Sequence, residues 1–211
     1  MTSVGLPATR DALLRRSVRL NVLTIAYNSL EGVIALIAGA LAGSVALTGF
    51  GLDSLIELTA GLTALWRLRA DVDPHKRERA ERISLRVIGG LFIALAAYVG
   101  IDAAWALYRR EAPDESVLGI VIAALSVVVM PLLARAKRRV AFALVSGALA
   151  AESQQTSLCA YLSSILLGGL TLNALAGWWW ADPVAAIAMV PIIAREGLEG
   201  LRGRSACDDC R

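Results

Sequence analysis

Long apolar runs alternate with short charged stretches along the whole chain. Each run is long enough to cross the roughly 30 Å hydrocarbon layer of a membrane as a helix. The runs are too long and too continuous for the alternating strands of a membrane β-barrel. The pattern therefore predicts an all-α membrane protein, a six-transmembrane-helix bundle with spans at about residues 18–41, 44–68, 83–108, 117–134, 140–170 and 183–201.

Composition supports this fold class. The 211 residues are 57% hydrophobic, and the mean hydropathy is +0.62. We expect a cytoplasmic segment at 1–17, a membrane domain at 18–201 and a cytoplasmic tail at 202–211 that contains cysteines. The net charge of +3 does not indicate a nucleic-acid partner, because the basic residues fall between the spans. The lipid bilayer is the expected surrounding.

The distribution of basic residues predicts the orientation. Of 21 Lys and Arg residues, only Arg109 and Arg110 fall on one side of the predicted bundle. The positive-inside rule then places both termini in the cytoplasm of a multi-pass protein in the cell (inner) membrane. The basic N-terminal segment leads into a long span without a cleavage site, so we interpret it as a leader into the first helix.

Two acids interrupt the second span. Asp53 and Glu57 are four residues apart, which places both on one face of a helix. A charged side chain at the bilayer centre costs roughly 2.5–3.5 kcal/mol even on a mild scale. A structural hydrogen bond to a neighbouring helix explains one such acid. For the pair we favour a cation site.

The fifth span carries a second polar set: Glu152, Gln155 and Cys159 share one helix face. Carboxylate, amide and thiolate groups together suit zinc or a related divalent transition metal. Because an empty site favours protonated carboxylates, metal binding and proton release are linked. For Gln155 and Cys159 alone, helix packing is the better explanation, and they gain weight as ligands only because Glu152 lies on the same helix.

Four other features are possible accessory sites. Asn28 and Glu31 lie three residues apart in the first span, although Asn28 is also compatible with a hydrogen bond across helices. Asp71 and His75 fall in a charged connection, which a solvated loop explains better than a metal site. In the tail, Cys207 and Cys210 form a CxxC pair. The pair is compatible with a metal site shared between two chains, with metal capture, with redox chemistry or with two reduced cysteines that have no role.

The chain resembles the cation diffusion facilitators, which are six-helix exporters of divalent metals. The resemblance covers nearly all of the sequence. It rests on the six-span plan and on four motifs, Ser44-Val-Ala-Leu, Asp53-Ser-Leu-Ile-Glu57, Leu162-Ser-Ser164 and Gly177-Trp-Trp-Trp-Ala-Asp182-Pro. We expect a short, atypical member without the ferredoxin-like cytoplasmic domain that many relatives have.

The resemblance implies which residues bind the metal. In that family the second and fifth helices each supply two ligands four residues apart. Asp53 and Glu57 match the first pair, with Glu in place of the usual Asp, and the second pair, normally His and Asp, falls on Gln155 and Cys159. Glu152, one turn earlier, is positioned to replace the missing histidine as ligand or proton carrier.

We therefore expect a homodimeric efflux transporter that exchanges zinc or another divalent metal, its substrate, for protons. We expect no organic cofactor and no enzyme activity, because no nucleophile and base are paired in the sequence. Two alternatives stay open: a cation channel lined by the intramembrane acids, and a non-transporting membrane metal sensor that uses the tail cysteines.

Overall fold

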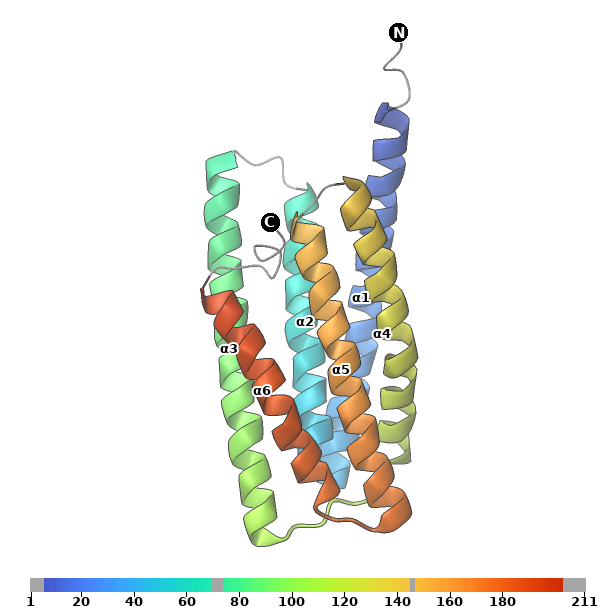
Figure 1. Ribbon diagram of the computed structural model, residues 1–211, viewed down its shortest axis with the longest axis vertical. Coiled ribbons are helices and arrows are strands. Elements are labelled where there is room, and N and C mark those ends of the chain that lie inside the picture. Colours follow the sequence, from blue (N-terminus) through green and yellow to red (C-terminus); the bar gives the residue numbers. More distant parts are fainter. Residues whose placement is uncertain (1–5, 70–73, 145–146, 203–211) are drawn as a thin grey trace.

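The computed structural model describes residues 6–69, 74–144 and 147–202 of the chain. These residues form six helices and confirm the predicted all-α bundle (Figure 1). The helices are α1 (Leu6–Ala42), α2 (Val45–Arg69), α3 (Pro74–Arg109), α4 (Val117–Leu144), α5 (Gly147–Ala176) and α6 (Ala181–Leu201).

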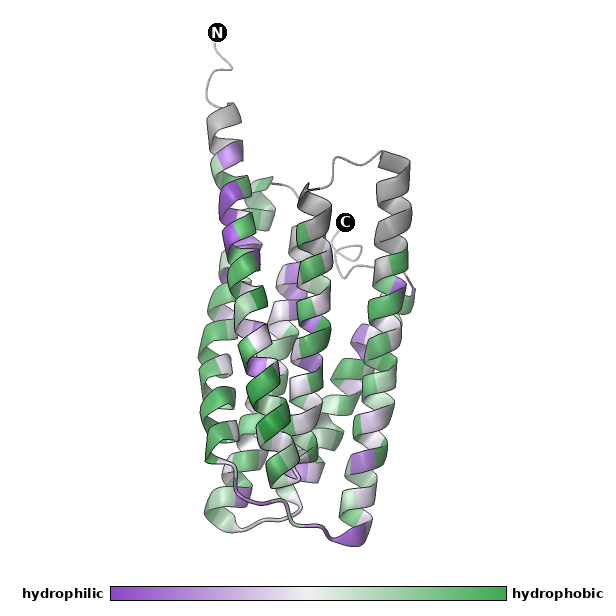
Figure 2. Ribbon diagram, turned by 180° about the vertical axis from the view of Figure 1, so that it is seen from behind, coloured by the Kyte–Doolittle hydropathy of each residue, from purple (hydrophilic) through white to green (hydrophobic). Residues whose placement is uncertain are grey.

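The helices of the bundle are long and expose apolar side chains, as in a membrane protein. Five of the described helices, α1 to α5, are long and apolar enough to cross a membrane. Helix α6 is not one of these five, and it carries four charged residues in 21, Asp182, Arg195, Glu196 and Glu199. Large apolar side chains are exposed on several helices. Figure 2 shows that hydrophobic residues predominate along the helices, whereas the α3–α4 connection is hydrophilic. An apolar surface of this extent fits contact with lipid.

Helix α2 lies at the centre of the packing. The most extensive pairs are α3 with α6, α4 with α5, and α1 with α2, and α2 also packs against α3, α5 and α6. The first turns of α1 lie at the same end of the bundle as the ends of the α2–α3 and α4–α5 hairpins (Figure 1). Because α2 packs against α1, α3, α5 and α6, the acid pair that it carries is surrounded by other helices.

The predicted boundary between the fourth and fifth spans is wrong. Helix α4 continues through the basic stretch 135–139 and ends at Leu144, and α5 begins at Gly147. Ala, Arg and Lys are strong helix formers, and the stretch contains neither Gly nor Pro. Its charge suggested a loop, but nothing in it ends a helix. Lys137 consequently lies inside α4.

An Asp directly before a Pro is a typical N-cap residue, but Asp182 does not cap its own helix. Helix α6 begins at Ala181, and its N-cap residue, Trp180, makes no side-chain capping hydrogen bond. The Asp182 carboxylate instead accepts hydrogen bonds from the Ser44 hydroxyl and from the backbone N–H groups of Val45 and Ala46. It thus satisfies donors at the start of α2, which have no partner within that helix.

Helices α1 and α2 approach closely because glycines line their contact. A Cβ atom on Gly51 would lie 2.9 Å from the backbone nitrogen of Leu36, and one on Gly39 would lie 2.8 Å from that of Thr48. Only a residue without a side chain fits at either position. This close contact brings Glu31 of α1 against Ser54 of α2.

Candidate metal-binding site

A small pocket unites polar residues of α2 and α5. Asp53 and Glu57 of α2 line it, together with Gln155 and Cys159 of α5. The offset of four residues within each pair places both members on one helix face, and the two helices pack against each other. The structure therefore brings together four of the five main residues that the sequence singled out.

The rest of the pocket is mostly apolar. Its other lining residues, apart from one acid, are Phe92, Leu158, Leu162, Ile192 and Ile193. Within this lining Asp53 and Glu57 are only 5% and 6% exposed. Carboxylates so poorly hydrated are costly unless a cation or a donor compensates them.

Among the described residues, no hydrogen bond offsets the cost of burying the Glu57 carboxylate. Neither of its carboxylate oxygens has a hydrogen-bond partner in the described part of the protein. Asn28 of α1 and Thr156 and Cys159 of α5 approach the carboxylate from two sides. A cation bound in the pocket would satisfy these oxygens.

Sequence reasoning missed one acid of the pocket. Glu196 of α6 lines it and lies close enough to Asp53 to act on it electrostatically. It follows Arg195 near the end of α6 and lies three residues before Glu199, so it belongs to a charged stretch of the sequence. Its offset of three and four residues from Ile193 and Ile192, which places it on their helix face, was the available signal.

Glu31 of α1 lies next to the site, where it approaches Cys159. It is fully buried, and one carboxylate oxygen accepts a hydrogen bond from the Ser54 hydroxyl at 3.0 Å. The thiol of Cys159 lies 3.9 Å from the same oxygen. Asn28 is also fully buried, and its amide approaches the Glu57 carboxylate of α2 without a hydrogen bond of regular geometry in the described residues. Cys159 thus lies between the pocket and Glu31.

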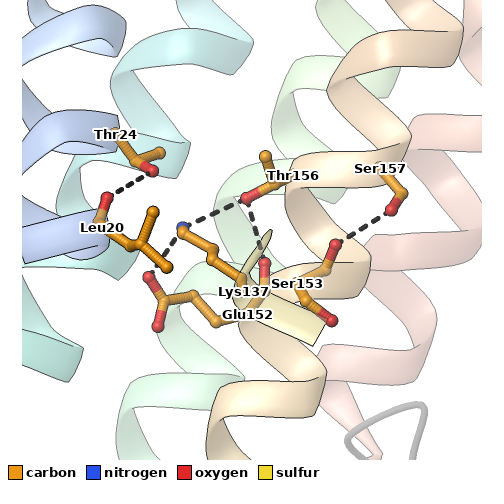
Figure 3. Close-up of polar contacts among 7 residues, drawn as sticks. All are labelled: Leu20, Thr24, Lys137, Glu152, Ser153, Thr156 and Ser157. Carbon is orange, nitrogen blue, oxygen red and sulfur yellow. Dashed lines mark hydrogen bonds and ion pairs between the residues drawn. The ribbon is translucent and has the colours of Figure 1, made fainter. Parts of the chain in front are cut away.

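Glu152 has a different environment. It is not among the residues that line the pocket. Its carboxylate accepts a hydrogen bond of 2.9 Å from the ammonium of Lys137 on α4, which also donates to Thr156 at 3.2 Å (Figure 3). The structure therefore gives Glu152 a cationic partner that the sequence interpretation had assigned to a loop.

Within the described ranges, no three Asp, Glu, His or Cys side chains are arranged to hold a metal ion. Asp53, Glu57 and Cys159 share a pocket without forming a closed ligand shell. His75 lies in the first turn of α3. Three other candidates, Asp71, Cys207 and Cys210, lie outside the described residues.

Comparison with known proteins identifies the type of domain. A family model described as the cation efflux transmembrane domain matches residues 22–203. The chain is also similar to a protein named uncharacterized transporter sll1263 of Synechocystis sp., at 30% identity over 162 residues. The match covers 72% of this chain and 51% of that protein, so the chain spans about half the length of this relative.

Proposed function

Because the chain belongs to the cation efflux family of membrane transporters, we propose that it exports a divalent metal, zinc or a closely related ion, in exchange for protons. The observation that carries the proposal is the pocket itself. It joins Asp53 and Glu57 with Gln155 and Cys159, and it contains a buried carboxylate without hydrogen-bond partners. Membership of a transporter family also agrees with the expectation that the chain is not an enzyme.

The four side chains suit a borderline metal. Two carboxylates supply hard oxygen ligands, the Gln155 amide supplies a neutral oxygen, and the Cys159 thiolate supplies a soft ligand. The ligands belong to two helices, α2 and α5. Relative movement of these helices therefore opens the site to one side of the membrane or the other. Removal of the metal leaves poorly hydrated acids that bind protons, which couples the two ions.

The proposal includes an orientation. Both termini lie in the cytoplasm and the protein resides in the cell membrane as a homodimer. The distribution of basic residues supports this orientation, because 19 of the 21 Lys and Arg residues fall in the terminal segments, the stretch 67–86 and the end of α4, all on the side assigned to the cytoplasm. The dimer is supported by the family resemblance alone.

Metal flux in proteoliposomes tests the function. The full chain is reconstituted, a pH gradient is imposed, and Zn²⁺ uptake is followed with a lumenal dye. Asp53→Asn and Glu57→Gln should each abolish the uptake that depends on the gradient. Asp102→Asn is the matched control, since Asp102 is an acid of α3 that does not line the pocket. Undiminished flux in both pocket variants would contradict the proposal, and single-channel currents would favour a channel.

A further inference from the structure

One basic side chain of α4 faces the interior of the bundle. Lys137 is only 4% exposed, whereas its neighbours Arg135, Arg138 and Arg139 are all exposed. It continues the buried stripe of α4 that includes Met130, Leu133 and Ala134. Lys137 is therefore buried because it lies on the inward face of α4, whereas the other basic residues of the stretch lie on the outward face.

The ammonium of Lys137 contacts one carboxylate directly and lies within electrostatic range of a second. It forms an ion pair with Glu152 at 2.9 Å and donates a hydrogen bond to Thr156 at 3.2 Å (Figure 3). Thr156 also approaches Glu57, and Lys137 is close enough to attract the Glu57 carboxylate electrostatically. One buried cation on α4 thus acts on Glu152 of α5 and on Glu57 of α2.

This arrangement affects a metal ion bound at Glu57 in two ways. The ammonium competes for the negative charge of the carboxylate, and it repels a divalent cation directly. Both effects are strong where water is scarce. The pairing with Glu152 offsets part of the lysine charge and restrains the ammonium on the α5 side.

We propose that Lys137 is a resident cation that competes with the transported metal for Glu57, and that Glu152 is the positioning residue that restrains it. This inference rests on the proposed function. Lys137 keeps metal affinity low enough for release, and Glu152 limits that competition. Glu152 acts on the metal through Lys137 and is not itself a ligand.

The two charges therefore have opposite effects on metal binding. Lys137→Gln removes the competitor and should tighten Zn²⁺ binding about tenfold or more while slowing turnover. Glu152→Gln releases the ammonium toward Glu57 and should weaken binding by a similar factor. The double variant Lys137→Gln/Glu152→Gln should bind as tightly as Lys137→Gln alone. Lys137→Arg, which keeps the charge, should bind like wild type.

Zn²⁺ titration of the full chain in detergent, against a competing chelator, measures these affinities. Arg138→Gln is the matched control, because Arg138 is an exposed cation next to Lys137 in the same helix. The double variant removes both members of the Lys137–Glu152 ion pair and leaves neither charge without its partner, so it remains informative if either single variant fails to fold. Tighter binding in this variant than in wild type supports the proposal.

Two outcomes would overturn the inference. The first is unchanged or weaker binding in the double variant. The second is weakening in Glu152→Gln that persists in the double variant, which would make Glu152 a metal ligand. Failure of the proposed function gives a different result, namely wild-type Zn²⁺ binding that Asp53→Asn and Glu57→Gln leave intact. In that case no metal binds at Glu57, and the competition proposed for Lys137 is also wrong.

Discussion

Asp182 in the first turn of α6 accepts a hydrogen bond from the hydroxyl of Ser44, which lies 138 positions earlier in the chain. The same carboxylate also accepts from two backbone N–H groups at the start of α2. The contact joins two of the motifs on which the family resemblance rests. It fixes the end of the helix that carries the acid pair to the last helix of the bundle.

We expect Asp182→Ala to destabilise the protein strongly. The substitution removes the Ser44 hydrogen bond and leaves buried N–H donors of α2 without partners, at about 1–3 kcal/mol for each unsatisfied group. Ser44→Ala should have a smaller effect, about 1 kcal/mol. Thermal unfolding in detergent measures both. Asp114→Ala, which alters an exposed acid of the α3–α4 connection, is the control. Equal stability of all three variants would show that the contact has no role in holding the helices together.

Glu196→Gln should reduce Zn²⁺ transport several-fold without abolishing it. Glu196 lines the pocket and adds negative charge near Asp53, so its loss weakens the attraction for a cation. Glu199→Gln is the control, because Glu199 pairs with Arg195 in an i,i+4 ion pair and does not line the pocket. Proteoliposome flux compares the two. Identical losses would indicate a general effect of charge at the end of α6.

Cys159 should determine which metals bind. Its thiolate prefers soft ions, so Cys159→Ser should weaken Cd²⁺ binding by about tenfold or more while changing Mn²⁺ binding little. The measurement is competitive titration with both ions, in a background that lacks the two tail cysteines. A parallel loss of both affinities would indicate that Cys159 supports packing and is not a ligand.

The sequence predicted the helices and four of the polar residues that line the pocket. The spacing of Asp53 and Glu57 in an apolar run predicted that they share a helix face, because residues four positions apart lie on the same face of any α-helix. Gln155 and Cys159 share a face for the same reason, and the family resemblance singled them out as the second pair. All four line the pocket that the structure shows.

The rest depends on contacts between helices that are distant in sequence. Asp182 had a plausible local role as a cap, yet its partners belong to α2. Glu152 matched a ligand face, but its neighbour is Lys137, whose position was hidden by the assignment of a basic stretch to a loop. Glu196 reaches the pocket only because α6 packs against α2 and α5.

The most direct measurement is zinc K-edge X-ray absorption on the full chain, with Cys207→Ser and Cys210→Ser as the background. We predict a single sulfur ligand at about 2.3 Å together with oxygen ligands. The sulfur signal should disappear in Cys159→Ser, and bound zinc should be lost in Asp53→Asn/Glu57→Gln. A spectrum without sulfur, or zinc retained when both acids are replaced, would contradict a metal site between α2 and α5.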